Sequence, residues 1–145
     1  MEILNEMRLM FLSRSENESF ARVTAAAFIS PSDPTVSEIV EVKTAVSEAV
    51  SNAVIHGYDK TIGVITLEMR LFSDYSVEIT ITDAGKGIPD INKAREPLFT
   101  TKTEEERSGM GFTVMESFMD SLQVESEPGK GTRVFMKKRL HPNHT

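Results

Sequence analysis

Cysteine is absent from the chain, which excludes disulfide bonds and thiolate metal ligands. No stretch approaches the roughly 20 consecutive apolar residues of a membrane-spanning helix, and the first residues lack the basic start and apolar run of a signal peptide. Positive charge is scarce: 16 lysines and arginines against 22 acidic residues give a net charge of −6, which argues against direct binding of nucleic acid. We therefore expect a cytoplasmic protein that binds neither membranes nor nucleic acid directly.

The composition is otherwise that of an ordinary globular protein, with 39% apolar and 26% charged residues. A chain of 145 residues fits around one hydrophobic core, and no internal repeat or linker divides it. We expect a single domain over residues 1–140 and a disordered tail at 141–145.

Hydrophobic periodicity predicts helices and strands interspersed along the chain. Ser15 is a candidate N-cap of the first helix, with Glu18 as its capping-box partner, and Pro31 ends that helix. Further helices are expected at 36–56 and 111–120, strands at 4–12, 64–72, 76–82, 122–126 and 132–138, and a polar surface segment at 90–107. This order predicts an α+β fold, a two-layer α/β sandwich with the helices packed on one face of a mixed, mainly antiparallel sheet.

Three polar side chains, Glu48, Asn52 and His56, are spaced four residues apart on the second predicted helix. This spacing places them along one side of the helix, at the border of its alanine and valine stripe. An asparagine oxygen is a hard ligand that suits Mg²⁺, and a glutamate can accept a proton from an attacking hydroxyl group. A solvated helix edge would have the same pattern, so this segment alone leaves both interpretations open.

A second motif, Asp83 with Gly85 and Gly87, follows directly after a predicted strand. Glycines let the backbone approach a ligand closely, and an aspartate at a strand end can accept a hydrogen bond from an exocyclic amine. An ordinary strand-to-loop turn has the same composition. The pair Gly131 and Thr132 at the start of the last predicted strand is a weaker signal, which a turn would also explain.

A third motif, Ser108, Gly109 and Gly111, leads into the last predicted helix. The exposed amides and the positive dipole end of a helix N-terminus form a site for phosphate. Lys102 and Arg107 are the nearby cations. A flexible hinge is the alternative interpretation of these glycines.

The order of these motifs over residues 40–135 is more informative than any one of them. A Glu/Asn helix, Asp-x-Gly-x-Gly, a polar segment, Gly-x-Gly and Gly-Thr follow one another. This order resembles the ATP-binding boxes of the GHKL superfamily, which includes histidine kinases and gyrase. Within it the chain most resembles the bacterial anti-sigma serine kinases, and among these the sporulation branch. That closer resemblance rests on the stretches 17–22, 46–53, 97–102 and 106–112 and covers nearly the whole chain.

The resemblance implies a role for each motif in binding ATP or ADP with Mg²⁺. It makes Glu48 the base and Asn52 the magnesium ligand. It assigns the reading of the adenine amino group to Asp83, with Gly87 beside the base and Thr132 in support.

The resemblance also assigns the phosphates to the third motif. Gly109 and Gly111 would let the backbone wrap them, with Lys102 and Arg107 as charge partners. The reaction it implies is transfer of the γ-phosphoryl group to a serine, in which positioning and charge stabilisation carry most of the catalysis.

The partners that the resemblance implies are proteins. They are an RNA polymerase sigma factor and an anti-anti-sigma protein of the STAS type, which is the phosphorylation substrate. Both would bind an overlapping surface that includes Arg22 on the first predicted helix, and the protein would be a homodimer.

Three other interpretations remain open. A sensor histidine kinase domain is disfavoured because such kinases carry the acceptor histidine before the ATP domain, and no histidine precedes residue 36. A nucleotide-gated protein that sequesters sigma without kinase activity is disfavoured by Glu48. A general-stress anti-sigma kinase is a close variant that only the resemblance disfavours.

Overall fold

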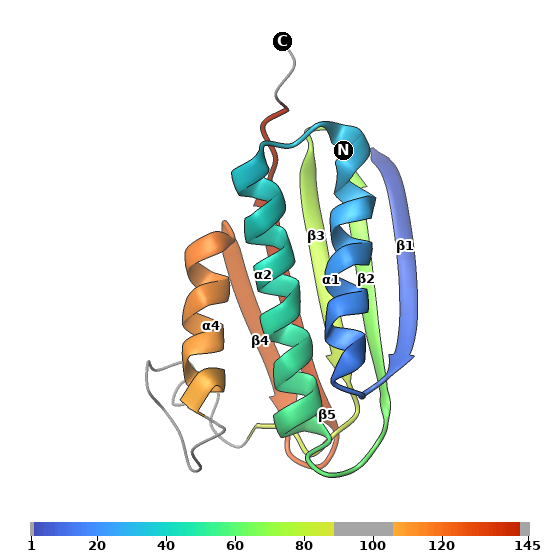
Figure 1. The fold of residues 1–145 in the computed structure, drawn as a ribbon, viewed down its shortest axis with the longest axis vertical. Coiled ribbons are helices and arrows are strands. Elements are labelled where there is room, and N and C mark those ends of the chain that lie inside the picture. Colours follow the sequence, from blue (N-terminus) through green and yellow to red (C-terminus); the bar gives the residue numbers. More distant parts are fainter. Residues whose placement is uncertain (1, 89–105, 143–145) are drawn as a thin grey trace.

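A computed structural model describes residues 2–88 and 106–142 of the chain, and of residues 106–110 it describes the backbone alone. In this part of the chain three α-helices cover one face of a five-stranded sheet, and the other face carries no helix (Figure 1). The α+β two-layer sandwich predicted from the sequence is confirmed.

The elements follow the predicted order closely. The strands are β1 (Ile3–Leu12), β2 (Val64–Phe72), β3 (Ser76–Asp83), β4 (Ser121–Glu127) and β5 (Gly131–Arg139). The helices are α1 (Glu16–Ile29), α2 (Val36–Asn52) and α4 (Glu106–Phe118), with a 3₁₀ turn η1 (Ser30–Ser32) after α1 and a π-turn η2 (Ala53–Gly57) after α2. None of the helices in the described ranges combines the length and the apolar character that crossing a membrane requires.

The strand order in the sheet is β1-β2-β3-β5-β4, and every neighbouring pair is antiparallel. The sheet is therefore antiparallel throughout the described strands, a simpler case of the mixed, mainly antiparallel sheet that we predicted. Because β5 lies between β3 and β4, the end of β3 meets the start of β5, and Asp83 stands opposite Thr132. This pairing joins two of the predicted motifs.

The hydrophobic core lies between the sheet and the helices. Ile79 and Ile81 of β3 point toward the helices and are at most 2% exposed, as the two-residue period of a strand requires. Ala45, Ala49 and Ala53 are buried as well, and their small side chains let the neighbouring elements pack closely against α2.

The predicted capping box at the first helix is wrong. Ser15 has helical backbone angles (φ −60°, ψ −32°) and its side chain makes no capping hydrogen bond, since a cap needs an extended backbone to face the first amides. Glu18 accepts a hydrogen bond from the Ser47 hydroxyl of α2 at 2.7 Å. A capping box is present at α2, where Thr35 and Glu38 exchange hydrogen bonds of 3.1 and 2.9 Å.

Replacing Thr35 by alanine should lower the free energy of unfolding by about 1 kcal/mol, because the start of α2 loses a side-chain acceptor. Thr24→Ala is the matched control, since the Thr24 hydroxyl donates to the Phe20 carbonyl within α1 at 2.8 Å and caps no helix. Urea unfolding of both variants at pH 7 measures the difference. Equal losses in the two variants would contradict the importance of the capping box.

Two chain segments differ from their predicted bounds. Helix α4 begins at Glu106, five residues before the predicted start at Gly111, because glutamate and arginine favour helix and a glycine weakens a helix without ending it. Within the predicted tail, the His141 amide donates a hydrogen bond to Glu38 Oε2 at 2.8 Å. Residues 143–145 lie outside the described part of the chain.

Candidate functional site

Glu48 and Asn52 lie one turn apart near the C-terminal end of α2, and α4 packs beside this helix (Figure 1). Gly111 of α4 lies directly against both side chains. A Cβ at Gly111 would stand 2.9 Å from Glu48 Oε2 and 3.6 Å from both terminal atoms of the Asn52 amide. The backbone of α4 thus packs closely against the two polar side chains, and this close contact requires a glycine at position 111.

Asn52 carries a buried polar atom that the described residues do not satisfy. Its Nδ2 atom has no hydrogen-bond partner within residues 2–88 and 106–142. Buried amide atoms nearly always have a partner, so this unpaired N–H donor points to an acceptor such as a phosphate oxygen of a ligand. The Asn52 Oδ1 atom is a hard oxygen donor, and Gly111 adds no side chain beside it. The donor set at this position therefore fits a magnesium ion with a phosphate group.

His56 lies beyond α2, which ends at Asn52 and not near His56 as we predicted. It lies in the π-turn η2, where the Tyr58 amide donates to the Ala53 carbonyl at 3.0 Å, five residues back. Turns of this kind occur frequently at functional sites, and this one delivers Gly57 to the next part of the site.

Asp83 ends β3 and is only 7% exposed, with its carboxylate facing the backbone of Gly57. A Cβ at Gly57 would lie 2.8 Å from Asp83 Oδ1, so a larger residue there would displace the carboxylate. The Gly85 amide donates to Asp83 Oδ1 at 2.9 Å. Burial raises the pKa of the carboxyl, while hydrogen bonds from the amides of Gly85 and Thr132 act in the opposite direction. The second predicted motif is therefore a buried acceptor held by backbone amides.

Thr132 supports the loop after β3 through a second hydroxyl group. Thr132 Oγ1 and Ser126 Oγ lie 2.8 Å apart, and Ser126 Oγ accepts a hydrogen bond from the Ile88 amide at 2.7 Å. This network joins the end of the Gly85–Gly87 loop to β4 and β5. Sequence analysis missed Ser126, because a lone serine on a strand gives no signal of such a role.

Several predicted residues lie apart from this group or outside the described chain. Arg22 is on α1, where its guanidinium group lies 3.3 Å from the Ser19 hydroxyl and 3.5 Å from the Ser47 hydroxyl. Lys102 lies outside the described residues, and for Arg107 and Ser108 only the helical backbone is described.

The predicted phosphate site in front of the last helix needs a correction. Because α4 begins at Glu106, Gly109 and Gly111 lie within the helix and do not precede it. The N-terminal amides of α4 therefore belong to the residues before Gly111. The role of Gly111 is to let the backbone of α4 lie close to the side chains of Glu48 and Asn52.

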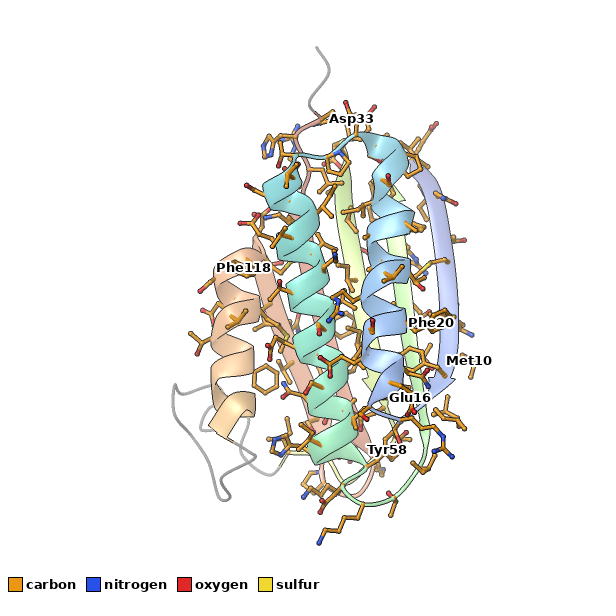
Figure 2. All side chains as sticks on the ribbon, in the orientation of Figure 1. Met10, Glu16, Phe20, Asp33, Tyr58 and Phe118 are labelled. Atoms are coloured by element: carbon orange, nitrogen blue, oxygen red, sulfur yellow. The ribbon has the colours of Figure 1, made fainter. Side chains whose placement is uncertain are left out.

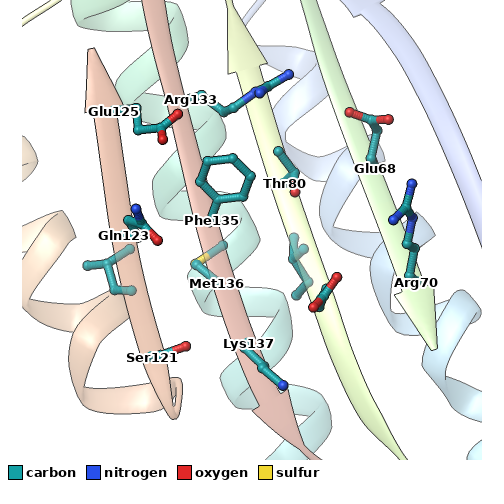
Figure 3. Close-up of a pocket in the computed structure, with 13 residues that line it drawn as sticks. Glu68, Arg70, Thr80, Ser121, Gln123, Glu125, Arg133, Phe135, Met136 and Lys137 are labelled. Atoms are coloured by element: carbon teal, nitrogen blue, oxygen red, sulfur yellow. The ribbon is translucent and has the colours of Figure 1, made fainter. Parts of the chain in front are cut away.

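The helix-free face of the sheet carries a separate open pocket of about 750 Å³ (Figure 3). It contains none of the residues predicted for the site. Its side chains form a polar, solvent-facing pattern, with Arg133 over the ring of Phe135 at 5.5 Å and Arg70 paired with Glu6 at 3.4 Å. Arg70 and Glu6 face each other across β2 and β1, and cross-strand pairs of this kind stabilise an exposed sheet face without a ligand. We therefore place the functional site on the helix side.

Comparison with known proteins identifies the family of the chain. A family model described as a histidine kinase-like ATPase domain matches residues 11–138. An anti-sigma F factor of Thermoanaerobacter sp. (strain X514) is 59% identical over 140 residues, which cover 97% of each chain. Another, of Clostridium botulinum (strain Eklund 17B / Type B), is 61% identical over 138 residues, covering 94% of this chain and 96% of the relative.

Among solved structures, the RsbU and RsbW domains of Rv1364c from Mycobacterium tuberculosis have the same fold. They align with a TM-score of 0.69 at 20% identity, over 94% of this chain and 32% of that chain. At this level of identity the likeness concerns the fold alone.

The fold and the family match define a histidine kinase-like ATPase domain, a class that binds nucleotides. More narrowly, the chain belongs to the anti-sigma F factor family, because its identity to those proteins extends over nearly the full length of both chains. The resemblance drawn from the motifs is thereby confirmed.

Replacing Gly111 by alanine should raise the stability of the protein and weaken its binding of nucleotide. The free energy of unfolding should rise by about 0.5–1 kcal/mol, because alanine is the better residue inside a helix. The new methyl group meets Glu48 Oε2, the end of a flexible side chain, and would displace that carboxylate from its position. Nucleotide binding, followed by calorimetry, should therefore weaken.

Ser117→Ala in the same helix is the matched control, since the Ser117 hydroxyl only donates to the Thr113 carbonyl at 3.0 Å. Its nucleotide affinity should equal that of the wild type. A Gly111→Ala protein that is less stable and binds nucleotide normally would refute the proposed contact.

Proposed function

We propose that this protein is an anti-sigma factor that binds and inhibits a sporulation RNA polymerase sigma factor. We further propose that it is an ATP-dependent serine kinase that phosphorylates the anti-anti-sigma antagonist of that sigma factor. The observation that carries the proposal is the near full-length identity of about 60% to anti-sigma F factors, one of which is 61% identical over 138 residues. The arrangement of the polar residues around α2 supports the catalytic part.

The nucleotide would lie across the end of α2. Asp83 would accept a hydrogen bond from the exocyclic amine of adenine, since its carboxylate is a buried acceptor with few competing donors. Asn52 would hold Mg²⁺ through Oδ1, and the bound ion would neutralise charge on the phosphates. Gly87 and Thr132 would support the base from the loop and from β5. Lys102, Arg107, Ser108 and Gly109 remain predicted phosphate contacts from the third motif.

Glu48 would act as the general base. Its carboxylate would accept the proton of the substrate serine hydroxyl while the serine oxygen bonds to the γ-phosphorus and ADP leaves. The position one turn before Asn52 supports this role, because it puts the proton acceptor beside the residue that would hold the magnesium-bound phosphates. Most of the rate acceleration would come from positioning and from charge stabilisation.

Arg22 would contact the protein partners. Its guanidinium group lies within 3.5 Å of the Ser47 hydroxyl, and Ser47 directly precedes Glu48 on α2. The Ser47 hydroxyl in turn donates to Glu18, so the partly buried arginine is tied to the helix that carries the base. A partner bound at Arg22 would therefore lie on the α1 side of α2, next to the residue that precedes Glu48.

We also propose a homodimer that uses the side of the molecule formed by α1 and β1. Strand β1 is an edge strand of the sheet, and a ten-residue edge can pair with a further strand. Large apolar side chains are exposed on this side, with Met10 61%, Phe20 51% and Val23 58% exposed (Figure 2). Sedimentation equilibrium should give the mass of two chains. A single-chain mass at micromolar concentration would remove this part of the proposal.

The kinase and the anti-sigma activity can be tested together. The purified protein is incubated with γ-labelled ATP and Mg²⁺, with and without a STAS-type anti-anti-sigma protein, and then with a tagged sporulation sigma factor. We expect label on a serine of the anti-anti-sigma protein and capture of the sigma factor by the nucleotide-bound protein. Arg22→Ala should weaken capture by about tenfold, the loss that removal of one well-placed charged contact produces.

Arg70→Ala is the matched control, because Arg70 is an exposed arginine on the helix-free face. It should leave capture unchanged. Sigma capture without any label on the acceptor would favour a sequestering protein without kinase activity. Absence of capture would refute the anti-sigma assignment.

A further inference from the structure

Tyr58 joins three segments that meet beside the candidate site. It follows the π-turn at the end of α2, near the lower end of that helix in Figure 2. Its hydroxyl donates to the Val64 carbonyl at 2.5 Å and accepts from the Ala84 amide at 2.8 Å. Val64 begins β2, and Ala84 follows Asp83 at the end of β3. One hydroxyl group therefore fixes the loop after Asp83 to β2 and to the end of α2.

The backbone around Tyr58 makes further contacts with the same loop. The Lys86 amide donates to the Gly57 carbonyl at 2.8 Å, and Lys86 Nζ lies 3.7 Å from Asp59 Oδ2. The Asp83 carboxylate itself faces Gly57. We call residues 57–59 the loop seat, because they hold residues 83–86 from one side.

The ring of Tyr58 is confined, so its hydroxyl has a defined position. A Cβ at Gly63 would lie 2.1 Å from Cε1 of the ring, which means that the ring packs closely against a residue without a side chain. The Thr61 amide donates to the Tyr58 carbonyl at 2.9 Å and closes the turn that carries the ring. A side chain held in this way can act as a rigid support for the loop that it contacts.

We propose that Tyr58 is a positioning residue for recognition of the adenine base. Its hydroxyl holds residues 83–86 in the conformation that directs the Asp83 carboxylate toward the exocyclic amine. This inference rests on the proposed function, since it assumes that the site binds ATP. The loop seat follows α2 through the π-turn η2, so the residues that would contact the base and the residues around Asn52 are joined by one short stretch of chain.

The test compares Tyr58→Phe with Tyr75→Phe, the same change at the other tyrosine of the chain. Tyr75 lies in the β2–β3 hairpin, where its amide donates to the Phe72 carbonyl at 2.9 Å. Each protein is titrated by calorimetry, in Mg²⁺, with ATP and with purine riboside triphosphate, which lacks the exocyclic amine. A thermal unfolding scan of each variant verifies that it is folded.

Tyr58→Phe should bind ATP about tenfold more weakly, the effect expected from one lost hydrogen bond that positions an acceptor. Its affinity for purine riboside triphosphate should equal that of the wild type, because that ligand does not contact the Asp83 carboxylate through an amine. Tyr75→Phe should match the wild type with both ligands. In kinase assays, KM for ATP should rise in Tyr58→Phe while kcat stays unchanged.

Equal weakening with both nucleotides would overturn the proposal, because it would reveal a general structural role. Unchanged ATP binding would overturn it too. If the wild type itself binds no nucleotide, the proposed function fails, and this outcome is distinct from the other two.

A double variant provides a second measurement. In an Asp83→Asn background, Tyr58→Phe should have no further effect on ATP affinity, since the two residues act through one contact. An additive loss in the double variant would contradict the proposed link between them.

Discussion

Asp83→Asn should weaken ATP binding by about 10- to 150-fold, because a hydrogen bond to a charged acceptor contributes about 1.5–3 kcal/mol. Asp83 Oδ1 already accepts from the Gly85 amide at 2.9 Å. An asparagine would keep its oxygen for that bond and turn its amide group toward the adenine amine, so that two donors would face each other. Calorimetric titration with ATP and Mg²⁺ measures the loss.

The same variant should keep its stability in the absence of nucleotide. Burial raises the pKa of the Asp83 carboxyl, although the amides of Gly85 and Thr132 oppose this. An acid whose pKa rises on folding stabilises the protein fully below its ordinary pKa of 3.8, and this contribution is lost as the pH rises through the folded pKa.

Asparagine does not titrate, so at pH 7 the free energy of unfolding of Asp83→Asn should equal or exceed that of the wild type. The difference should shrink as the pH is lowered toward 3.8, the ordinary pKa of the group. Urea unfolding at several pH values measures this. A marked loss of stability at pH 7 would mean that the hydrogen bonds to Asp83 outweigh its burial.

Glu38→Gln is the matched control, because Glu38 is also 7% exposed but lies at the other end of α2. Burial opposes its ionisation, yet hydrogen bonds from Thr35 and His141 outweigh burial and hold the pKa below the ordinary 4.5. The contribution of Glu38 to stability is therefore present above pH 4.5 and lost as the pH falls through the folded pKa. Glu38→Gln should reduce stability at pH 7 and leave ATP affinity unchanged, the reverse of Asp83→Asn.

The sequence was sufficient to predict the order and type of the elements, because their periodicities are local properties. The helix pattern of α2 and the alternation in β2 and β3 are visible in windows of about ten residues. Glu48 and Asn52 could be found for the same reason, since their spacing is a property of one helix. The start of β5 at Gly131 and Thr132 was found through its place in the order of motifs.

The residues that the sequence did not reveal act through contacts between distant segments. Tyr58 reaches Val64 and Ala84 because a π-turn displaces it from the axis of α2, and no local pattern predicts such a turn. The starts of α1 and α2 show the same limit. Ser15 and Thr35 both precede acidic residues three positions on, and only backbone conformation decides that Thr35 caps and Ser15 does not.

Glu48→Gln should reduce phosphoryl transfer to the serine acceptor by about 10²- to 10⁴-fold, the usual contribution of a general base. The substitution keeps the shape of the side chain, which lies against Gly111, but removes its ability to accept a proton. ATP affinity should be retained, because the proposed base contact is to the acceptor hydroxyl and not to the nucleotide. Single-turnover labelling with γ-labelled ATP separates the chemical step from binding.

Glu41→Gln is the control for this change, since Glu41 lies two turns earlier on α2 and pairs with Lys138 at 3.1 Å, away from Asn52. Labelling by Glu41→Gln should match that of the wild type, whereas a common loss in both variants would indicate damage to the helix. If Glu48→Gln labels the acceptor at nearly the wild-type rate, Glu48 is not the base. Catalysis would then come from positioning and charge stabilisation around Asn52 alone, which the loose transition state of phosphoryl transfer would permit.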